Sequence, residues 1–273
     1  MKKFFIIKLY IMLITTCGVS ENFIVYYEDK DSASAFLDYD TIVFDSEWHP
    51  EFSLLREKKK TVLGYLSVGE ISASRPYYHK FKEAGLLMME NENWKGSYFV
   101  DVRDSRWTKF IVEELIPGLL HKGFSGVFID TIDNPSHLER LDAEKYKGMR
   151  SGAVHLIKAI RYHYPDILIM VNRGYEILPD IAPQINMVLA ECLFSKYNFK
   201  AGRYGLRPGD EVNKEVKSLM RLRDANPELK LYSLDYTGSK NDRSKQMLYK
   251  KSRDAGFIPH VSTIHLNDII REK

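Results

Sequence analysis

Short hydrophobic segments rich in Val, Ile, Phe and Tyr recur along the chain and predict eight buried strands. Between them lie longer stretches of mixed polarity, several of which end in a glycine, as helices often do. Hydrophobicity that is continuous rather than alternating is typical of parallel strands covered on both faces. The predicted strands are 23–28, 41–45, 61–67, 126–130, 167–172, 187–191, 229–235 and 257–261, and helix-length segments include 105–122, 138–163, 210–225 and 240–254. This alternation predicts an α/β fold, a single (β/α)8 TIM barrel.

The segment 68–125, between the third and fourth predicted strands, is far longer than one strand-to-strand connection needs. We therefore expect an enlarged loop insertion after the third strand. It is rich in carboxylates and aromatic residues, including Tyr77, Tyr78, Trp94 and Trp107. Aromatic faces stack on sugar rings, so the insertion is a candidate wall of a sugar-binding cleft. The alternative is that these rings only pack the insertion against the barrel. A second Gly- and Pro-rich segment, 202–209, is expected to form a loop at the rim.

The predicted strands turn polar at their C-terminal ends, the edge where barrel enzymes place their chemistry. A single polar residue at such an end is usually a helix cap or turn former. Here seven of the eight strands end in this way, which favours a functional site. The residues are Glu28, Asp45, Ser67, Asp130, Asn172, Glu191 and Asp235.

Asp130 and Glu191 are the candidate catalytic pair. Side-chain alternation within each strand allows both carboxylates to face the barrel axis. Two carboxylates in one cleft are the minimum for glycoside hydrolysis, in which one acts as nucleophile or base and the other as general acid. Candidate substrate contacts around the pair are Asp45, Tyr65, Ser67, Glu70, Asp133, Asn172, Asp235 and Tyr236.

Residues 1–20 are typical of a signal peptide, with a basic start and a short apolar run. The run is too short to span a bilayer comfortably, and Lys8 interrupts it. The sequence before Cys17 also resembles a bacterial lipoprotein processing site, so Cys17 is a candidate for acylation. We therefore expect an exported protein, periplasmic or at the cell surface, that touches the membrane only through such an anchor. Residues 21–273 would form the barrel domain.

Charge and motifs exclude several function classes. The 40 basic and 37 acidic residues balance once Lys2, Lys3 and Lys8 of the leader are set aside, which argues against a nucleic-acid partner. Motifs for phosphate-binding loops, dinucleotide folds, serine-hydrolase elbows and zinc sites are missing from the sequence. The two cysteines provide neither a disulfide framework nor a Cys-based metal site. We expect a monomer that acts without cofactor or metal.

Four sequence blocks resemble the endo-α-1,4-polygalactosaminidase family, glycoside hydrolase family 114, over roughly residues 23–265. They are Gly64–Glu70, Ser74–Tyr78, Trp94 with Phe99–Trp107, and Gly123–Asp133. Ser125 departs from the family, which commonly has Asp there. The resemblance implies a TIM barrel that cleaves α-1,4 linkages in galactosamine and N-acetylgalactosamine polysaccharides. It also implies that Asp130 is the nucleophile and Glu191 the acid/base.

Two alternatives to this function remain open: a carbohydrate-binding lipoprotein that keeps the barrel without turnover, and a glycosidase of different linkage specificity. On the substrate, the predicted arrangement gathers further acids at the active edge of a neutral chain. They are Glu28, Asp45, Glu47, Glu70, Asp101, Asp104, Asp133 and Asp235. An acidic cleft suits a cationic, deacetylated amino sugar, and salt should then weaken its binding.

Overall fold

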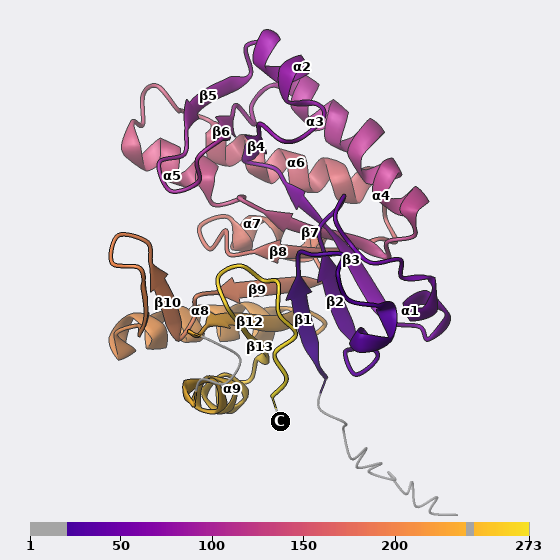
Figure 1. The fold of residues 1–273 in the computed structure, drawn as a ribbon. Coiled ribbons are helices and arrows are strands. Elements are labelled where there is room, and N and C mark those ends of the chain that lie inside the picture. Colours follow the sequence, from indigo (N-terminus) through magenta and orange to yellow (C-terminus); the bar gives the residue numbers. More distant parts are fainter. Residues whose placement is uncertain (1–20, 239–242, 273) are drawn as a thin grey trace, which may run out of the picture.

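The computed structural model describes residues 21–238 and 243–272 (Figure 1). The predicted signal peptide and Cys17 lie outside the described residues. Eight parallel strands form one sheet in the order β1-β2-β3-β7-β8-β9-β12-β13. The sheet curls into a nearly closed barrel, because the Tyr27 N–H, just after β1, donates to the Leu266 carbonyl beyond β13 at 2.8 Å. The predicted TIM barrel is confirmed.

All eight predicted strands are present, with ends that shift by two residues at most. Their bounds are β1 Phe23–Tyr26, β2 Thr41–Phe44, β3 Thr61–Ser67, β7 Gly126–Asp130, β8 Leu168–Asn172, β9 Met187–Glu191, β12 Lys230–Tyr236 and β13 Ile258–Ser262. Parallel pairing brings the strand ends level: Ser67 on β3 is the register partner of Asp130 on β7. The C-terminal ends of neighbouring strands therefore meet at one edge.

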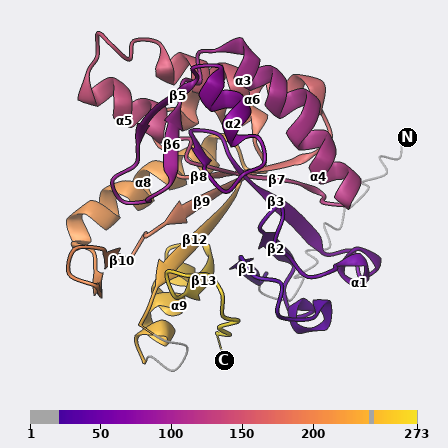
Figure 2. The same cartoon turned by 45° about the horizontal axis from the view of Figure 1, so that its top comes forward.

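Helices cover the outside of the barrel, and Figure 2 shows α4, α6, α8 and α9 spread around the strands. Their bounds are η1 Ala33–Phe36, α1 Ser53–Glu57, α2 Tyr78–Glu83, α3 Ser105–Phe110, the π-helix η2 Ile111–Leu115, α4 Ile116–Lys122, α5 Asn134–Leu141, α6 Met149–His163, α7 Leu178–Ile181, η3 Ala182–Gln184, α8 Gly209–Ala225 and α9 Ser244–Asp254. The segment 138–163, expected as one helix-length stretch, spans two helices, because turns occupy 143–148 and Gly148 adopts a left-handed φ of 89°. In the described residues no helix is long and apolar enough to cross a membrane.

The insertion after β3 is a small subdomain rather than a loop. It contains the antiparallel sheet β4-β6-β5, with β4 Glu70–Ser72, β5 Leu87–Glu90 and β6 Ser97–Val100, together with α2. Trp107 anchors it: the ring is fully buried and its indole N–H donates to the Val68 carbonyl at 2.8 Å. The segment 202–209 likewise belongs in part to a hairpin, β10 Ser195–Asn198 with β11 Arg203–Leu206, which follows β9.

Two hydrophobic clusters build the core. The larger lies between the strands and the helices and continues into the insertion. The smaller fills the barrel interior with side chains such as Phe23, Val43, Phe128, Met170 and Leu189, from five different strands. A filled interior leaves the ends of the strands as the place for a site.

Candidate active site

Asp130 and Glu191 face each other at the C-terminal ends of β7 and β9, with Asn172 of β8 between them. The Asn172 amide nitrogen Nδ2 donates to Oδ1 of Asp130 at 2.9 Å and to Oε2 of Glu191 at 2.6 Å. These two carboxylate oxygens are therefore no farther apart than the two bonds laid end to end, 5.5 Å. The predicted convergence of the two acids is present in the structure, and Asn172 holds it.

A tyrosine hydroxyl supports each acid from the opposite side. Tyr65 on β3 donates to Oδ2 of Asp130 at 2.9 Å, and Tyr236 on β12 donates to Oε1 of Glu191 at 2.5 Å. Burial, followed by the adjacent carboxylates, raises the pKa of both tyrosines well above its usual value. Both hydroxyls therefore keep their protons and act as donors. Three of the predicted contact residues, Tyr65, Asn172 and Tyr236, thus bind the acids directly.

The electrostatic surroundings give Glu191 the character of an acid. Burial and then the nearby negative charge of Asp130 raise the pKa of Glu191, although the hydrogen bonds from Tyr236 and Asn172 act in the opposite direction. A carboxyl group with a raised pKa holds its proton at a pH where its neighbour is ionised. Asp130 likewise accepts two hydrogen bonds, from Tyr65 and Asn172.

The residues that directly follow Asp130, Asn172 and Glu191 have a left-handed backbone conformation. Thr131, Arg173 and Cys192 have φ values of 61°, 58° and 57°, a region that non-glycine residues rarely adopt and that is least favourable for a β-branched residue such as Thr131. Hydrogen bonds hold these conformations. The N–H groups of Arg173 and Cys192 donate to the carbonyls of neighbouring strands at 2.8 and 2.7 Å, and the Thr131 hydroxyl accepts from the Gly69 N–H at 2.8 Å. Strained backbone that the surroundings hold in place is common at active sites.

Four other residues predicted to contact substrate form ion pairs or hydrogen bonds with other groups of the protein. Asp45 forms an ion pair with Arg75 at 2.8 Å. The Ser67 hydroxyl donates to the Glu70 carbonyl at 2.8 Å, while the Glu70 carboxylate accepts from Asn91, Ser97 and Asn134. Asp235 is 1% exposed and accepts the backbone N–H groups of Phe194 and Ser195, both at 2.7 Å. These bonds hold the insertion and the loop after Glu191 in place, and a substrate contact by any of the four residues stays a prediction.

Most of the acids predicted to gather at the active edge have a basic side chain nearby. Asp45, Glu47, Asp101 and Asp104 each form an ion pair with a basic side chain at 2.6–2.9 Å, and Asp133 lies 3.6 Å from Arg173. Burial raises the pKa of Asp235 to about 7, so its negative charge is also incomplete near neutral pH. The basic partners of Asp45, Glu47 and Asp133 lie far away along the chain, whereas those of Asp101 and Asp104 are only two residues on.

Two further residues at the site were missed in the sequence. Tyr27 follows β1, and its ring lies edge-on to Tyr65 with a centroid separation of 5.3 Å. Burial raises its pKa well above the usual value, and the negative charges of Asp130 and Glu191 add to the shift. Arg75 lies over the rings of Trp48 and Tyr65, at 5.5 and 5.9 Å. Tyr27 stands at a strand end and could have been found by the same rule as the others, whereas the only local signal for Arg75 is its place in the Ser74–Tyr78 block.

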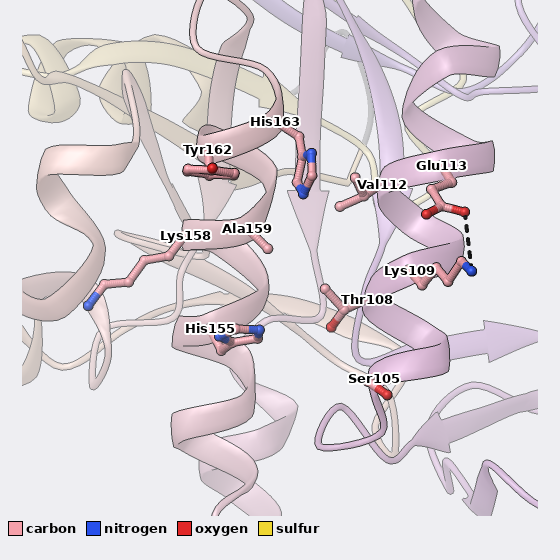
Figure 3. Close-up of a pocket in the computed structure, with 10 residues that line it drawn as sticks. All are labelled: Ser105, Thr108, Lys109, Val112, Glu113, His155, Lys158, Ala159, Tyr162 and His163. Carbon is pink, nitrogen blue, oxygen red and sulfur yellow. Dashed lines mark ion pairs between the residues drawn. The ribbon is translucent and has the colours of Figure 1, made fainter.

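Two hollows flank the barrel. One of about 200 Å³ adjoins the site, because Tyr65, Ser67 and Arg75 line it. Another of about 520 Å³ lies on the outer helical layer between the α3 to η2 segment and α6, where His155 and His163 face the Lys109–Glu113 ion pair (Figure 3). It contains no pair of carboxylates and is separate from the site. Among the described residues, no group of three or more His, Cys, Asp or Glu side chains is arranged to hold a metal ion.

A filled (β/α)8 barrel with two facing carboxylates at the C-terminal ends of its strands defines the class of barrel glycoside hydrolases. The model of glycoside-hydrolase family GH114 matches residues 16–272. The chain therefore belongs to this family, and the enzyme class expected from the sequence is confirmed. No curated protein matches the chain.

Solved structures show the same fold at low sequence identity. The glycoside hydrolase domain of PelA from Pseudomonas aeruginosa superposes with a TM-score of 0.81 at 21% identity, covering 92% of this chain and 98% of that one. Aspergillus fumigatus Ega3, in complex with galactosamine, gives a TM-score of 0.69 at 15% identity over 93% and 95% of the two chains. An α-amylase from Geobacillus thermoleovorans, complexed with acarbose, is more distant, with a TM-score of 0.52 at 10% identity over 90% and 70%.

Proposed function

We propose that this chain is an exported glycoside hydrolase that cleaves α-1,4-linked galactosamine and N-acetylgalactosamine polysaccharides, with Asp130 as nucleophile and Glu191 as acid/base. The observation that carries the proposal is the Asn172 amide, which bridges the two acids with bonds of 2.9 and 2.6 Å. Retaining glycosidases have carboxyl groups about 5–5.5 Å apart, whereas inverting enzymes leave a wider gap of roughly 6.5–9.5 Å for water. The bridged geometry favours retention.

The reaction then proceeds in two displacements. Glu191 donates its proton to the glycosidic oxygen while an Asp130 oxygen attacks the anomeric carbon, which breaks the linkage and forms a glycosyl ester. Glu191, now ionised, takes a proton from water as that water attacks the same carbon and releases Asp130. Two inversions at one carbon leave the product with the α configuration of the substrate. Tyr65 and Asn172 position Asp130, and Tyr236 and Asn172 position Glu191.

The substrate class rests on the family and on one structural neighbour. Ega3 was crystallised with galactosamine, and this chain shares its fold over most of its length. Membership of GH114 supports the same class of amino-sugar polymer. Since most rim acids are ion-paired, the geometry does not require the sugar to carry a free amine.

Incubation of the purified barrel domain with α-1,4-linked galactosamine and N-acetylgalactosamine chains, with oligosaccharide release followed by mass spectrometry, tests the proposal. Asp130→Asn and Glu191→Gln should each lower turnover by orders of magnitude, because each conserves volume while removing a charge or a proton that the transition state needs. Matched controls are Asp166→Asn and Glu228→Gln, two exposed acids just before β8 and β12 at the far end of the barrel. They should retain wild-type rates.

The outcomes separate the alternatives. Proton NMR should show that the α-anomer is released first, while an initial β-anomer would replace retention by inversion. A wild-type domain that binds these chains without cleaving them would indicate a carbohydrate-binding barrel. Full activity in either catalytic-pair variant would remove that residue from the mechanism.

Export is the second part of the proposal and rests on residues 1–20. Metabolic labelling with a fatty acid tests the anchor: wild-type protein should carry the label and sediment with membranes, whereas Cys17→Ser should lose both. Equal membrane association of the two proteins would argue against acylation of Cys17.

A further inference from the structure

Two exposed aromatic rings meet above the site edge, although they are 105 positions apart in the sequence. Trp94 lies in the turn between β5 and β6, and Phe199 in the turn between β10 and β11. Their ring centroids are 5.4 Å apart at an interplanar angle of 75°. Even so, 53% of Trp94 and 48% of Phe199 remain exposed. We refer to this pair as the aromatic bridge.

The aromatic bridge is continuous with the active site on the side of Glu191. Phe199 contacts Tyr197 at 5.1 Å, and Tyr197 contacts Tyr204 at 4.8 Å. Tyr204 in turn packs against the hydrophobic cluster of the barrel interior. A row of rings therefore leads from the barrel mouth to Phe199. The hairpin that carries it begins four residues after Glu191.

On the other side the aromatic bridge is tied to Glu70, the first residue of β4 in the insertion. The backbone N–H of Trp94 donates to the Asn91 carbonyl at 3.2 Å, and the Asn91 side chain donates to the Glu70 carboxylate at 2.7 Å. The insertion and the hairpin leave from β3 and β9, while β7 and β8 lie between those strands in the sheet. The ring contact therefore spans the strands that carry Asp130 and Asn172.

The exposure of these rings is not explained by a structural role. Trp107 already anchors the insertion with a fully buried ring, and its indole N–H is bonded. The Trp94 indole N–H, by contrast, has no acceptor within the described part of the chain. Two large rings, half in water and with a free donor beside them, are typical of a binding surface rather than of a core.

The charge around Phe199 indicates which sugar fits. Residues 195–206 contain three basic side chains, Lys196, Lys200 and Arg203, and no acidic one. All three are exposed, and none forms an ion pair with a described residue. With Glu90, Glu92 and Lys95 beside Trp94 included, the two turns carry four basic and two acidic side chains, and this excess of positive charge disfavours a protonated amino sugar more than an N-acetylated one.

We propose that the aromatic bridge is a subsite that stacks on an N-acetylated sugar of the polymer, away from the bond that is cleaved. This inference rests on the proposed function and deepens it. The catalytic pair acts on one linkage, while the aromatic bridge selects an acetylated unit farther along the chain. Acetylation pattern, rather than overall positive charge, then decides where the polymer is cut.

Variants of the two rings test the proposal on α-1,4-linked N-acetylgalactosamine oligosaccharides of increasing length. Trp94→Ala and Phe199→Ala should lower kcat/KM on long chains by about tenfold, the equivalent of about 1.4 kcal/mol for the loss of one stacking contact. Chains too short to reach the aromatic bridge should be cleaved at the wild-type rate. Trp94→Phe should restore most of the loss. The matched control is Tyr162→Ala, which removes a ring on α6 that is 83% exposed.

Matched deacetylated chains provide the second arm. Their kcat/KM should change less in Trp94→Ala than that of acetylated chains of the same length. An unchanged length dependence, an equal loss on short and long chains, or a larger loss on deacetylated chains would each overturn the subsite. If the wild-type enzyme cleaves none of these substrates, the proposed function fails instead, and the two failures are distinct.

Discussion

Asp130 and Asp235 both stand at the ends of barrel strands, yet their surroundings give them different tasks. Asp130 faces Glu191 through the Asn172 amide, whereas Asp235 is buried against the backbone of the loop after β9. Alternation on β12 accounts for the difference. Tyr236 reaches Glu191, so its neighbour Asp235 must point to the other side of the strand. Residue type and strand position predicted the catalytic pair, but choosing between adjacent residues requires the direction of each side chain.

The Tyr236 hydroxyl provides a test of the acid role at the residue scale. Its hydrogen bond opposes the rise in the pKa of Glu191, so Tyr236→Phe should raise that pKa further. An acid catalyst works only while protonated, so activity should persist to a higher pH, with the basic limb of kcat/KM displaced upward. Tyr249→Phe, which removes a hydroxyl bonded to the Ile270 carbonyl, is the control. A basic limb that stays in place or moves down would show that Glu191 is not the acid.

The Glu70→Gln variant tests whether Glu70 stabilises the fold or contacts substrate. Its carboxylate accepts from Asn91, Asn134 and Ser97, so the amide of Glu70→Gln would place a donor against groups that already donate. We expect the free energy of unfolding to fall by about 1–3 kcal/mol, as urea titration would measure. Glu83→Gln, at an exposed position of α2, should leave it unchanged. Unaltered stability in Glu70→Gln together with weaker substrate binding would return Glu70 to the substrate contacts.

At the scale of elements, local pattern predicted the barrel strands well and the additions to the barrel poorly. A buried parallel strand must be apolar along its whole length, and each of the eight strands shows that signal. The insertion is different, because β4, β5 and β6 have three or four residues each and are partly exposed. Their hydrogen bonds depend on strands brought together by folding. The β10–β11 hairpin was likewise not predicted as strands, because its residues are mostly exposed and include basic ones rather than a hydrophobic run.

Gly69 joins the insertion to the site and makes their packing testable. A Cβ at this position would lie 2.2 Å from the Thr131 carbonyl oxygen, in the turn that directly follows Asp130. Because that obstacle is backbone, Gly69→Ala should cost about 1–3 kcal/mol of unfolding free energy and should lower kcat by displacing Asp130. Gly118→Ala on α4 meets nothing within 4 Å and should be neutral or stabilising. Equal stability and equal kcat in both variants would contradict this account of the turn.

At the scale of the whole molecule, the barrel closes where β13 meets β1, and His260 is buried in that seam beside Phe23. Burial lowers the pKa of His260 from 6.5 to about 3. Between these two values the unfolded chain binds a proton that the native barrel does not. This residue therefore lowers stability progressively as the pH falls below 6.5, and contributes no pH dependence above it.

Urea unfolding at pH 7 and pH 4.5 measures that effect. Between pH 7 and pH 4.5 the unfolding free energy should fall less in His260→Leu than in the wild type, by on the order of 2–3 kcal/mol. Each pH unit below 6.5 contributes about 1.4 kcal/mol to this difference. The comparison is within each protein, so a lower starting stability of the variant does not matter. Replacement of exposed His121 by Leu should leave the wild-type pH dependence intact. The same dependence in all three proteins would show that His260 is protonated in the native barrel.

The left-handed residues that follow β8 and β9 mark the points beyond which the loops of this enzyme can be replaced. Arg173 and Cys192 have left-handed φ values directly after their strands, and their N–H groups are already bonded to neighbouring strands. Asn172 and Glu191 are therefore fixed before the following loops begin. Loops grafted beyond Gly174, or beyond the Phe194–Ser195 backbone that binds Asp235, would carry a new binding surface without displacing the acids. In this family, specificity is then free to diverge by replacement of whole loops on an unchanged catalytic base.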